Sequence, residues 1–546
     1  MKRTVAALLV LALSGVEGLA GCAPAPLPRL DRGAVAAPEP HAAKVGIDIL
    51  RRGGNAVDAA IAVQFALAVT FPNAGNLGGG GFMLVHHRDR SAAIDYRERA
   101  PAAATRDMFL DRAGNVVPRL SLDTALAAGV PGTVAGMWLA HRRFGSLPWK
   151  DLVEPAVRLA EHGWILDSWS ARSFDAESRH NARDYFKGAA GERFVQKELA
   201  ATLRRVADGG PDGFYRGETA RLIVEEMKRS NGLLTLDDLA SYEAKERVPL
   251  EGSYRGLRVV SMPPPSSGGV ALLQLLGMIE PRDVRALGFH SAAHLHAVCE
   301  IEKRVFADRA EYLGDPDFTK VPVERLVSPA YLKRRMSDLT ERRSDPAGIA
   351  PGPEETTHFS VVDRWGGAVA NTTTLNGNYG CGLVVRGAGF LLNNEMDDFS
   401  AKPGAMNMFG ATGGAANAVA AGKRPLSSMA PAFVFRDGAL WLVLGTPGGT
   451  TIFTTVFQVI VNRADFGMSL EDAVRAPRFH HQWPPAHREE DPVWFEAAPA
   501  AADALRALGY SVRVRGRIGD VQAVEIDGPR GLPVSDPRGI GAALTE

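Results

Sequence analysis

The segment Thr356-Thr-His-Phe-Ser-Val-Val-Asp363, followed by Arg364-Trp-Gly366 and then by Ala368-Val-Ala-Asn-Thr-Thr-Thr374, predicts a β-hairpin. Threonine, valine and phenylalanine favour strands, and a short loop that contains glycine can reverse the chain direction. The chain is strand-rich from this point onward. Further strands are expected over Gly389–Leu392, Phe433–Arg436 and Leu440–Leu444.

The register of the hairpin determines which side chains meet. If Asp363 pairs with Gly367 across the three-residue loop, Thr356 lies opposite Thr374 on the same face of the ribbon. A register one residue longer would place Leu375 there instead. We prefer the first register because it matches the small polar residues Thr372 and Thr374 with His358 and Thr356. Taken by themselves, the threonines are also compatible with simple strand propensity.

A second unusual segment is Leu440-Trp-Leu-Val-Leu-Gly-Thr-Pro-Gly-Gly449, a hydrophobic strand that ends in two glycines before an expected helix at Thr451–Val461. Backbone N–H groups at such a helix start carry the positive end of the helix dipole, and glycine lets a ligand approach them closely. These are the properties of an oxyanion hole. An ordinary strand-to-helix turn would have a similar sequence.

The hairpin is preceded by residues 337–355, where proline, glycine and charge accumulate, as is typical of a linker. Before the linker the pattern is mainly helical, with helices expected from His41 to Gly53 and from Asn55, a good N-cap, to Thr70. The glycine cluster of Asn76–Phe82 lacks the Gly-Lys-Ser/Thr ending of a phosphate loop, so a nucleotide site is not expected. His290, His294 and His296 lie close together in the sequence, but they do not have the spacing of a zinc-binding helix.

Composition excludes several classes of protein. The 546 residues carry 62 Lys+Arg and 62 Asp+Glu, so the chain has no net basic charge for nucleic acid. With 46% hydrophobic and 23% charged residues, it is not a disordered chain. Three cysteines cannot form a disulfide framework. Length alone predicts roughly three to four domains.

The N-terminus has the pattern of a secretory signal: Met1-Lys-Arg3, an apolar run, and small residues before Cys22. The ending Leu19-Ala-Gly-Cys22 resembles the lipobox of bacterial lipoproteins, in which the cysteine is acylated. A plain signal with an incidental cysteine is the alternative. We therefore expect a signal peptide over 1–21, a Pro/Ala-rich tether over 22–40, and an exported protein of the periplasm, outer membrane or cell surface. We expect the protein to contact a membrane only through a lipid attached to Cys22.

From about Ala37 to its end, the chain resembles the γ-glutamyltranspeptidases, which are N-terminal nucleophile hydrolases. The resemblance rests on several long motifs in the same order. These are Asp95-Tyr-Arg-Glu98, Ser261-Met-Pro-Pro-Pro-Ser-Ser-Gly-Gly269, Thr356-Thr-His-Phe-Ser360, Leu392-Asn-Asn-Glu-Met-Asp-Asp-Phe399, Arg424-Pro-Leu-Ser-Ser-Met429 and Pro447-Gly-Gly449.

The resemblance implies an α+β fold, the four-layer αββα sandwich, formed by two subunits of one precursor. The precursor would cut itself between Glu355 and Thr356, giving a large subunit over 41–355 and a small catalytic subunit over 356–546. Thr356 would then be the nucleophile, with its own new α-amine as the base. Thr374 would lie beside it and position its hydroxyl.

The resemblance also implies a pocket for a γ-glutamyl group. Arg97 would bind the α-carboxylate, with the hydroxyls of Ser427 and Ser428 beside it. The α-ammonium would be bound by the side chains of Glu395, Asp398 and Asn376. The oxyanion would accept hydrogen bonds from the backbone N–H groups of Gly448 and Gly449.

The chain departs from the family pattern at two positions. A flap is expected over residues 399–421, but Phe409 stands where many bacterial relatives have a tyrosine that bonds to the asparagine at 376. Phenylalanine can cover the pocket and cannot make that hydrogen bond. Glu395 stands where some relatives have glutamine, which adds negative charge near the expected ammonium.

The expected activity is transfer of the γ-glutamyl group of glutathione and related compounds to water, amino acids or peptides. No metal and no organic cofactor are expected. Two alternatives remain open: a related acylase of the cephalosporin or glutaryl type, and a non-catalytic surface lipoprotein that keeps the fold.

Overall fold

Strands β9 (Thr357–Val362) and β10 (Ala368–Thr374) form the expected hairpin in the computed structural model, which describes residues 29–337, 339, 342–343, 356–483 and 492–546. Val362 pairs with Ala368 and Thr357 with Thr373, which is the predicted register. The loop closes with hydrogen bonds between Asp363 and Gly367. The signal, Cys22, Glu355 and most of the expected linker lie outside the described residues.

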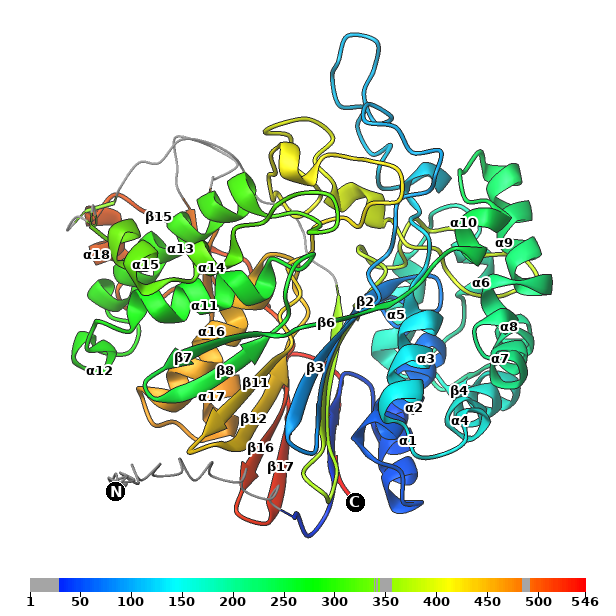
Figure 1. Cartoon of the computed structure of the whole chain (residues 1–546), viewed down its shortest axis with the longest axis horizontal. Helices are drawn as coiled ribbons and strands as arrows, with labels where there is room; N and C mark the ends of the chain where they lie inside the picture. Colours follow the sequence, from blue (N-terminus) through cyan, green and yellow to red (C-terminus); the bar gives the residue numbers. More distant parts are fainter. Residues whose placement is uncertain (1–28, 338, 340–341, 344–355, 484–491) are drawn as a thin grey trace, which may run out of the picture.

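The hairpin lies near the middle of a seven-stranded antiparallel sheet, and a second, six-stranded antiparallel sheet packs against it (Figure 1). In spatial order, the first sheet contains β18 (Ala542–Thr545), β1 (Ala34–Ala37), β9, β10, β2 (Gly80–His87), β3 (Arg90–Asp95) and β6 (Lys245–Arg247). The second contains β17 (Arg530–Ser535), β16 (Gln522–Asp527), β12 (Ala439–Gly445), β11 (Ala432–Arg436), β8 (Leu257–Ser261) and β7 (Leu250–Tyr254).

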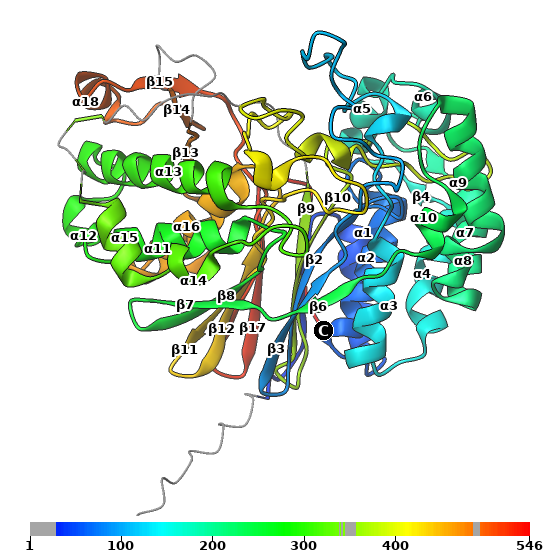
Figure 2. The ribbon, with the colours of Figure 1, turned by 45° about the horizontal axis from the view of Figure 1, so that its top comes forward.

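Helices cover the outer face of each sheet, which completes the four layers (Figures 1 and 2). The first helical layer contains α1 (Pro40–Arg51), α2 (Ala56–Thr70), α3 (Thr133–Phe144), α4 (Trp149–His162), α5 (Ser168–Ala176), α6 (Ala182–Tyr185), α7 (Lys197–Gly209), α8 (Asp212–Tyr215), α9 (Gly217–Ser230) and α10 (Leu236–Ala240). The other side carries α11 (Gly268–Ile279), α12 (Val284–Leu287), α13 (Ala292–Tyr312), α14 (Val323–Leu326), α15 (Pro329–Arg335), α16 (Thr451–Ala464), α17 (Leu470–Arg475) and α18 (Ala502–Ala507).

Smaller strands and 3-10 helices complete the structure. One small sheet contains three strands and another contains two, and three short 3-10 helices lie in the connections. They are β13 (Phe479–His481), β14 (Pro492–Phe495), β15 (Ser511–Val514), β4 (Trp164–Ile165), β5 (Arg193–Phe194), η1 (Ala125–Ala127), η2 (Glu395–Asp398) and η3 (Ala415–Asn417).

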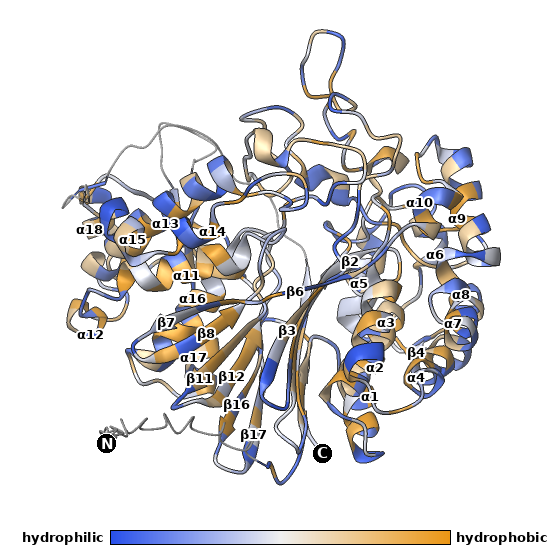
Figure 3. Cartoon of the chain, in the orientation of Figure 1, coloured by the Kyte–Doolittle hydropathy of each residue, from blue (hydrophilic) through white to orange (hydrophobic). Residues whose placement is uncertain are grey.

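The alternation of strand residues explains the layers. In β9, Val361 packs into the hydrophobic cluster shared with the first helical layer, whereas Val362 packs into the cluster that lies between the sheets and reaches α11 and α16. Neighbouring residues of a strand point to opposite faces, so one sheet serves two cores. Figure 3 shows hydrophobic residues along the strands of the second sheet, between the two helical layers. The expected αββα fold is confirmed.

Three expectations are corrected. The tether does not extend to Pro40, because Ala34–Ala37 form β1, a fully buried strand between β18 and β9. The small residues of this segment have the composition of a low-complexity tether, yet their side chains fit between the closely packed layers. Residues 389–392 make only isolated bridges, since the chain turns at Gly387 and Gly389 with positive φ. Finally, the described residues do not divide into three or four domains, because each of the two large sheets contains strands from before and from after Thr356.

Candidate active site

Thr356 lies directly before β9, which contacts β12 and β16 of the second sheet. It is 7% exposed, and Thr374 ends the neighbouring strand β10. The hydroxyl of Thr374 accepts a hydrogen bond from the backbone N–H of Asn376 at 2.8 Å, which leaves its own proton to donate. The confirmed register therefore brings the two threonines to adjoining strand ends, as predicted.

The nearest histidine along β9 does not provide a base. His358 is buried between the sheets, and its Nδ1 lies 2.8 Å from the Thr372 hydroxyl. Burial lowers the pKa of His358 to about 3, which makes the imidazole a weak base. A base for Thr356 must come from another group.

Gly448 and Gly449 lie between the end of β12 and the start of α16, as the sequence predicts. Their φ angles are 131° and 51°. Within the part of the chain that the structure describes, neither N–H donates a hydrogen bond to another protein group. Two unused N–H groups at the start of a helix provide the donors that an oxyanion requires.

Arg97 lies directly after β3 and is 1% exposed. Its guanidinium forms ion pairs with Glu395 and Asp398, both in η2, and lies 3.6 Å from a carboxylate oxygen of Glu98. Its Nε donates to the carbonyl of Pro425 at 3.1 Å. The residues predicted to bind opposite ends of an amino acid are thus in direct contact with one another.

Three carboxyl groups lie around the Arg97 guanidinium in a buried space, and the pKa values of two of them, Glu98 and Glu395, are raised. Burial raises the pKa of Glu98 to about 7, against the opposing effect of Arg97. Burial also raises the pKa of Glu395 well above its usual range, and the neighbouring carboxylates add to this shift. Burial by itself lowers the pKa of Arg97, but the neighbouring carboxylates have the larger combined effect, so the pKa of Arg97 is raised overall. The raised pKa values favour the protonated forms of Glu98 and Glu395, because burial outweighs the attraction of the Arg97 charge.

The remaining predicted residues surround this cluster. Ser427 and Ser428 follow Pro425, and the Ser428 hydroxyl lies 3.3 Å from the guanidinium of Arg309. Asn376 has a positive φ of 73° and donates from Nδ2 to the carbonyl of Asn394 at 3.0 Å. These bonds fix the side chains that face Arg97.

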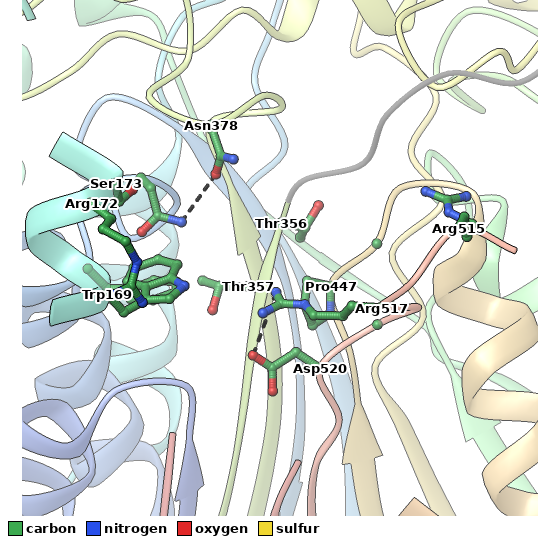
Figure 4. Close-up of a pocket in the computed structure, with 14 residues that line it drawn as sticks. Trp169, Arg172, Ser173, Thr356, Thr357, Asn378, Pro447, Arg515, Arg517 and Asp520 are labelled. Atoms are coloured by element: carbon green, nitrogen blue, oxygen red, sulfur yellow. Dashed lines mark hydrogen bonds and ion pairs between the residues drawn. The ribbon is translucent and has the colours of Figure 1, made fainter. Parts of the chain in front are cut away.

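One small cavity collects nearly all of the predicted site residues, and its volume is about 10 Å³, too small for a ligand. Any ligand of these residues would therefore have to open the cavity. Its lining includes Arg97, Thr356, Thr374, Asn376, Glu395, Asp398, Phe409, Ser427, Ser428 and Gly449. Gly448 instead lines a neighbouring cavity, which also reaches Thr356 (Figure 4).

Phe409 covers the cavity as the sequence suggests. It is 5% exposed and lines the cavity, and its ring lies against the backbone of Gly449. Asn376 bonds to Asn394 and contacts the sulfur of Met408 at 3.6 Å instead of bonding to a flap hydroxyl. The Phe409 ring thus adds an apolar contact to the flap, and Gln482 holds the same residue by donating from Nε2 to the Phe409 carbonyl at 3.0 Å.

Residues 42–545 match the sequence profile of the family described as Gamma-glutamyltranspeptidase. The chain belongs to this family. It is 52% identical to the glutathione hydrolase proenzyme of Pseudomonas aeruginosa, with 94% of this chain and 95% of that protein aligned. The corresponding Escherichia coli K12 proenzyme is 47% identical, with 94% and 91% aligned. The crystal structure of a cephalosporin acylase from Bacillus halodurans superposes with a TM-score of 0.82 at 26% identity, covering 98% of this chain and 99% of that one.

Sequence reasoning missed several residues that support the gamma-glutamyltranspeptidase site. Arg309 of α13 is buried, which lowers its pKa to about 10, and its Nε donates to Ser267 at 3.0 Å. Asn407 of the flap donates to Asp398 at 2.6 Å. A charged residue on the buried face of a helix was the available signal for Arg309, whereas no local pattern distinguishes Asn407.

The described ranges contain no group of three or more His, Cys, Asp or Glu side chains arranged to hold a metal ion. In the same ranges, no helix has both the length and the apolar character needed to span a membrane.

Proposed function

We propose that this gamma-glutamyltranspeptidase is a self-processing enzyme that hydrolyses the γ-glutamyl amide of glutathione and related compounds, and that also transfers the acyl group to amino acids or peptides. The observation that carries the proposal is the convergence of Thr356, the Gly448–Gly449 turn and the Arg97 cluster on adjoining cavities. The identity to two glutathione hydrolase proenzymes supports the same substrate class.

Processing would create the catalytic base. In the uncut chain the nitrogen of Thr356 is an amide, which is not basic. Cleavage between Glu355 and Thr356 converts it to an α-amine that can take the proton of the Thr356 hydroxyl. The product would be a heterodimer of residues 356–546 and the preceding chain, and the mixed sheets explain why both parts would stay together.

In the proposed reaction, the Thr356 hydroxyl oxygen attacks the γ-carbonyl carbon, and its proton passes to the α-amine. The resulting oxyanion accepts hydrogen bonds from the N–H groups of Gly448 and Gly449. The α-amine then returns the proton to the leaving nitrogen as the C–N bond breaks. Water or an amine releases the γ-glutamyl group from Thr356 by the reverse sequence.

Substrate recognition would follow from the charges around Arg97. The α-carboxylate would replace a protein carboxylate on the guanidinium, with Ser427 and Ser428 beside it. The α-ammonium would then compensate the displaced Asp398 and Glu395. The α-amino acid end of the substrate adds one positive and one negative charge, so the net charge of the buried cluster does not change on binding.

This balance distinguishes the proposal from the acylase alternative. A glutaryl group has the carboxylate but no ammonium, so it would leave Asp398 and Glu395 without a partner. We expect the processed enzyme to release p-nitroaniline from γ-glutamyl-p-nitroanilide at least about 100-fold faster, as kcat/KM, than from glutaryl-p-nitroanilide. Equal or reversed preference would favour the acylase. Glutamate binding without self-cleavage or turnover would favour the non-catalytic lipoprotein.

The oxyanion role of the glycine turn gives a further expectation. Gly449→Ala should lower kcat for γ-glutamyl-p-nitroanilide about 100- to 1000-fold. Its φ of 51° is unfavourable for alanine, and the new Cβ would lie 2.5 Å from Cδ1 of Phe409, so the N–H must move. Gly438→Ala is the matched control, with a φ of 81° and open space around the Cβ. A Gly449→Ala enzyme with the kcat of the Gly438→Ala enzyme would exclude the role.

The location of the enzyme is also part of the proposal. The N-terminal pattern supports export, and acylation of Cys22 would anchor the enzyme to a membrane. Mass spectrometry of the mature N-terminus would report whether the chain begins at Cys22 and whether that residue carries lipid.

A further inference from the structure

A second cavity adjoins Thr356, and arginine is prominent in its lining. The volume is about 410 Å³, and Thr356 is the one described residue that lines both this cavity and the Arg97 cavity. Arg172 and Trp169 of α5 lie on one wall, and Arg517, from the loop after β15, lies on the opposite wall (Figure 4). The size lies within the usual range for small-molecule sites.

The position of this cavity relative to Thr356 defines what it would hold. In the acyl-enzyme, the acyl carbon is bonded to Thr356, and its oxygen faces the glycine turn. Gly449 lines the Arg97 cavity, whereas Gly448 lines the second one. If the γ-glutamyl chain occupies the first cavity, the departing or incoming amine must occupy the second, because these are the two sides of the same carbon.

The charges of the lining favour an anion. The lining includes Arg172, Arg517 and one carboxylate, Asp520, together with Arg515, which has an interaction partner of its own. Asp520 is buried, which raises its pKa to about 7, so it does not fully offset even one arginine. Its nearest oxygen lies 3.9 Å from the Arg517 guanidinium, whose side chain remains 42% exposed. Arg172 forms no ion pair with any residue that the structure describes.

The same cavity has an aromatic wall. The Trp169 ring stacks on Phe71 at a centroid distance of 5.3 Å and an interplanar angle of 7°. The rigid pair provides an apolar surface beside the arginines, where the side chains of a peptide can pack.

We propose that this cavity binds the leaving group and the acceptor by their carboxylate, with Arg172 and Arg517 as specificity-determining residues, so that amino acids and peptides with a free C-terminal carboxylate are preferred to amines without one. The inference rests on the proposed function. In the transfer step, the acceptor nitrogen forms a bond to the acyl carbon as the bond to the Thr356 oxygen breaks. The proton of the acceptor amine passes through the α-amine to that oxygen.

Partition of one acyl-enzyme between water and two acceptors tests this role. γ-Glutamyl-p-nitroanilide supplies the acyl group, and glycylglycine or glycylglycinamide is added at equal concentrations of free amine. The measured quantity is the ratio of transfer product to glutamate, which cancels effects on acylation. We expect the wild type to prefer glycylglycine, and the Arg172→Ala/Arg517→Ala variant to lose about 10-fold of that preference. Arg172→Lys/Arg517→Lys should retain most of it, and salt should weaken it in the wild type.

Arg183→Ala is the matched control, since Arg183 is an exposed arginine of α6 outside the cavity lining. It should keep the wild-type preference. An unchanged preference in the double alanine variant, with p-nitroaniline still released, overturns the inference and leaves the proposed function standing. If the processed wild type releases no p-nitroaniline, the proposed function itself fails.

Discussion

Thr356→Ala should yield a single uncut chain with at least about 10⁴-fold less γ-glutamyl-p-nitroanilide hydrolysis than the wild type. One substitution removes two functions: the hydroxyl that would cut the precursor and the hydroxyl that would form the acyl-enzyme. Thr356 is buried at a strand end, so loss of one hydroxyl and one methyl group should leave the fold intact. A denaturing gel and N-terminal sequencing would report the missing cut, and the anilide assay the missing activity.

Thr356→Ser is the matched control for this prediction. It keeps a hydroxyl nucleophile and should still be cut and remain active, although more slowly, because serine lacks the methyl group that restricts the side-chain rotamer. A Thr356→Ala chain that is cut before position 356, or that hydrolyses the anilide while uncut, would contradict the assignment of Thr356 as nucleophile.

Arg97→Met should reduce kcat/KM for γ-glutamyl-p-nitroanilide about 10³-fold, because a buried charge partner of the substrate carboxylate is lost. The discriminating measurement uses 4-aminobutanoyl-p-nitroanilide, which lacks only the α-carboxylate. The wild type should strongly prefer the γ-glutamyl substrate, and the variant should lose that preference. Arg97→Lys should retain part of it, since lysine keeps the charge but not the two-pronged geometry.

A structural role for Arg97 would give a different result. Arg424 is the matched control, because it is also a buried arginine, and its NH1 pairs with Asp95 at 2.9 Å outside the Arg97 cavity. Arg424→Met should lower the thermal stability and still discriminate between the two anilides. If Arg97→Met behaves in the same way, Arg97 is a structural ion-pair partner and not the carboxylate site.

Local sequence signals predicted the elements that carry the chemistry. The hairpin register followed from loop length and from the matching of Thr372 with His358, and the structure has that pairing. The helix after Asn55 begins with a capping box, as the N-cap residue suggested. The glycine turn before α16 also lies where the hydrophobic strand ends. These signals act within a few residues of one another, so no knowledge of distant contacts was needed. The roles of the pocket residues came from the family resemblance and not from spacing.

Local signals failed where packing between distant segments decides the outcome. The Ala34–Ala37 segment has the composition of a tether, and only its place between β9 and β18 makes it a core strand.

The sequence by itself determined the nucleophile candidate, its strand partner and the motifs that place the chain in its family. The tertiary structure decided which charges share one desolvated space. It paired Arg97 with Glu395 and Asp398, about 300 positions away, and set Arg172 across a cavity from Arg517. Strand and helix propensities act locally, whereas the environment of a charge is the sum over all segments that exclude water from it.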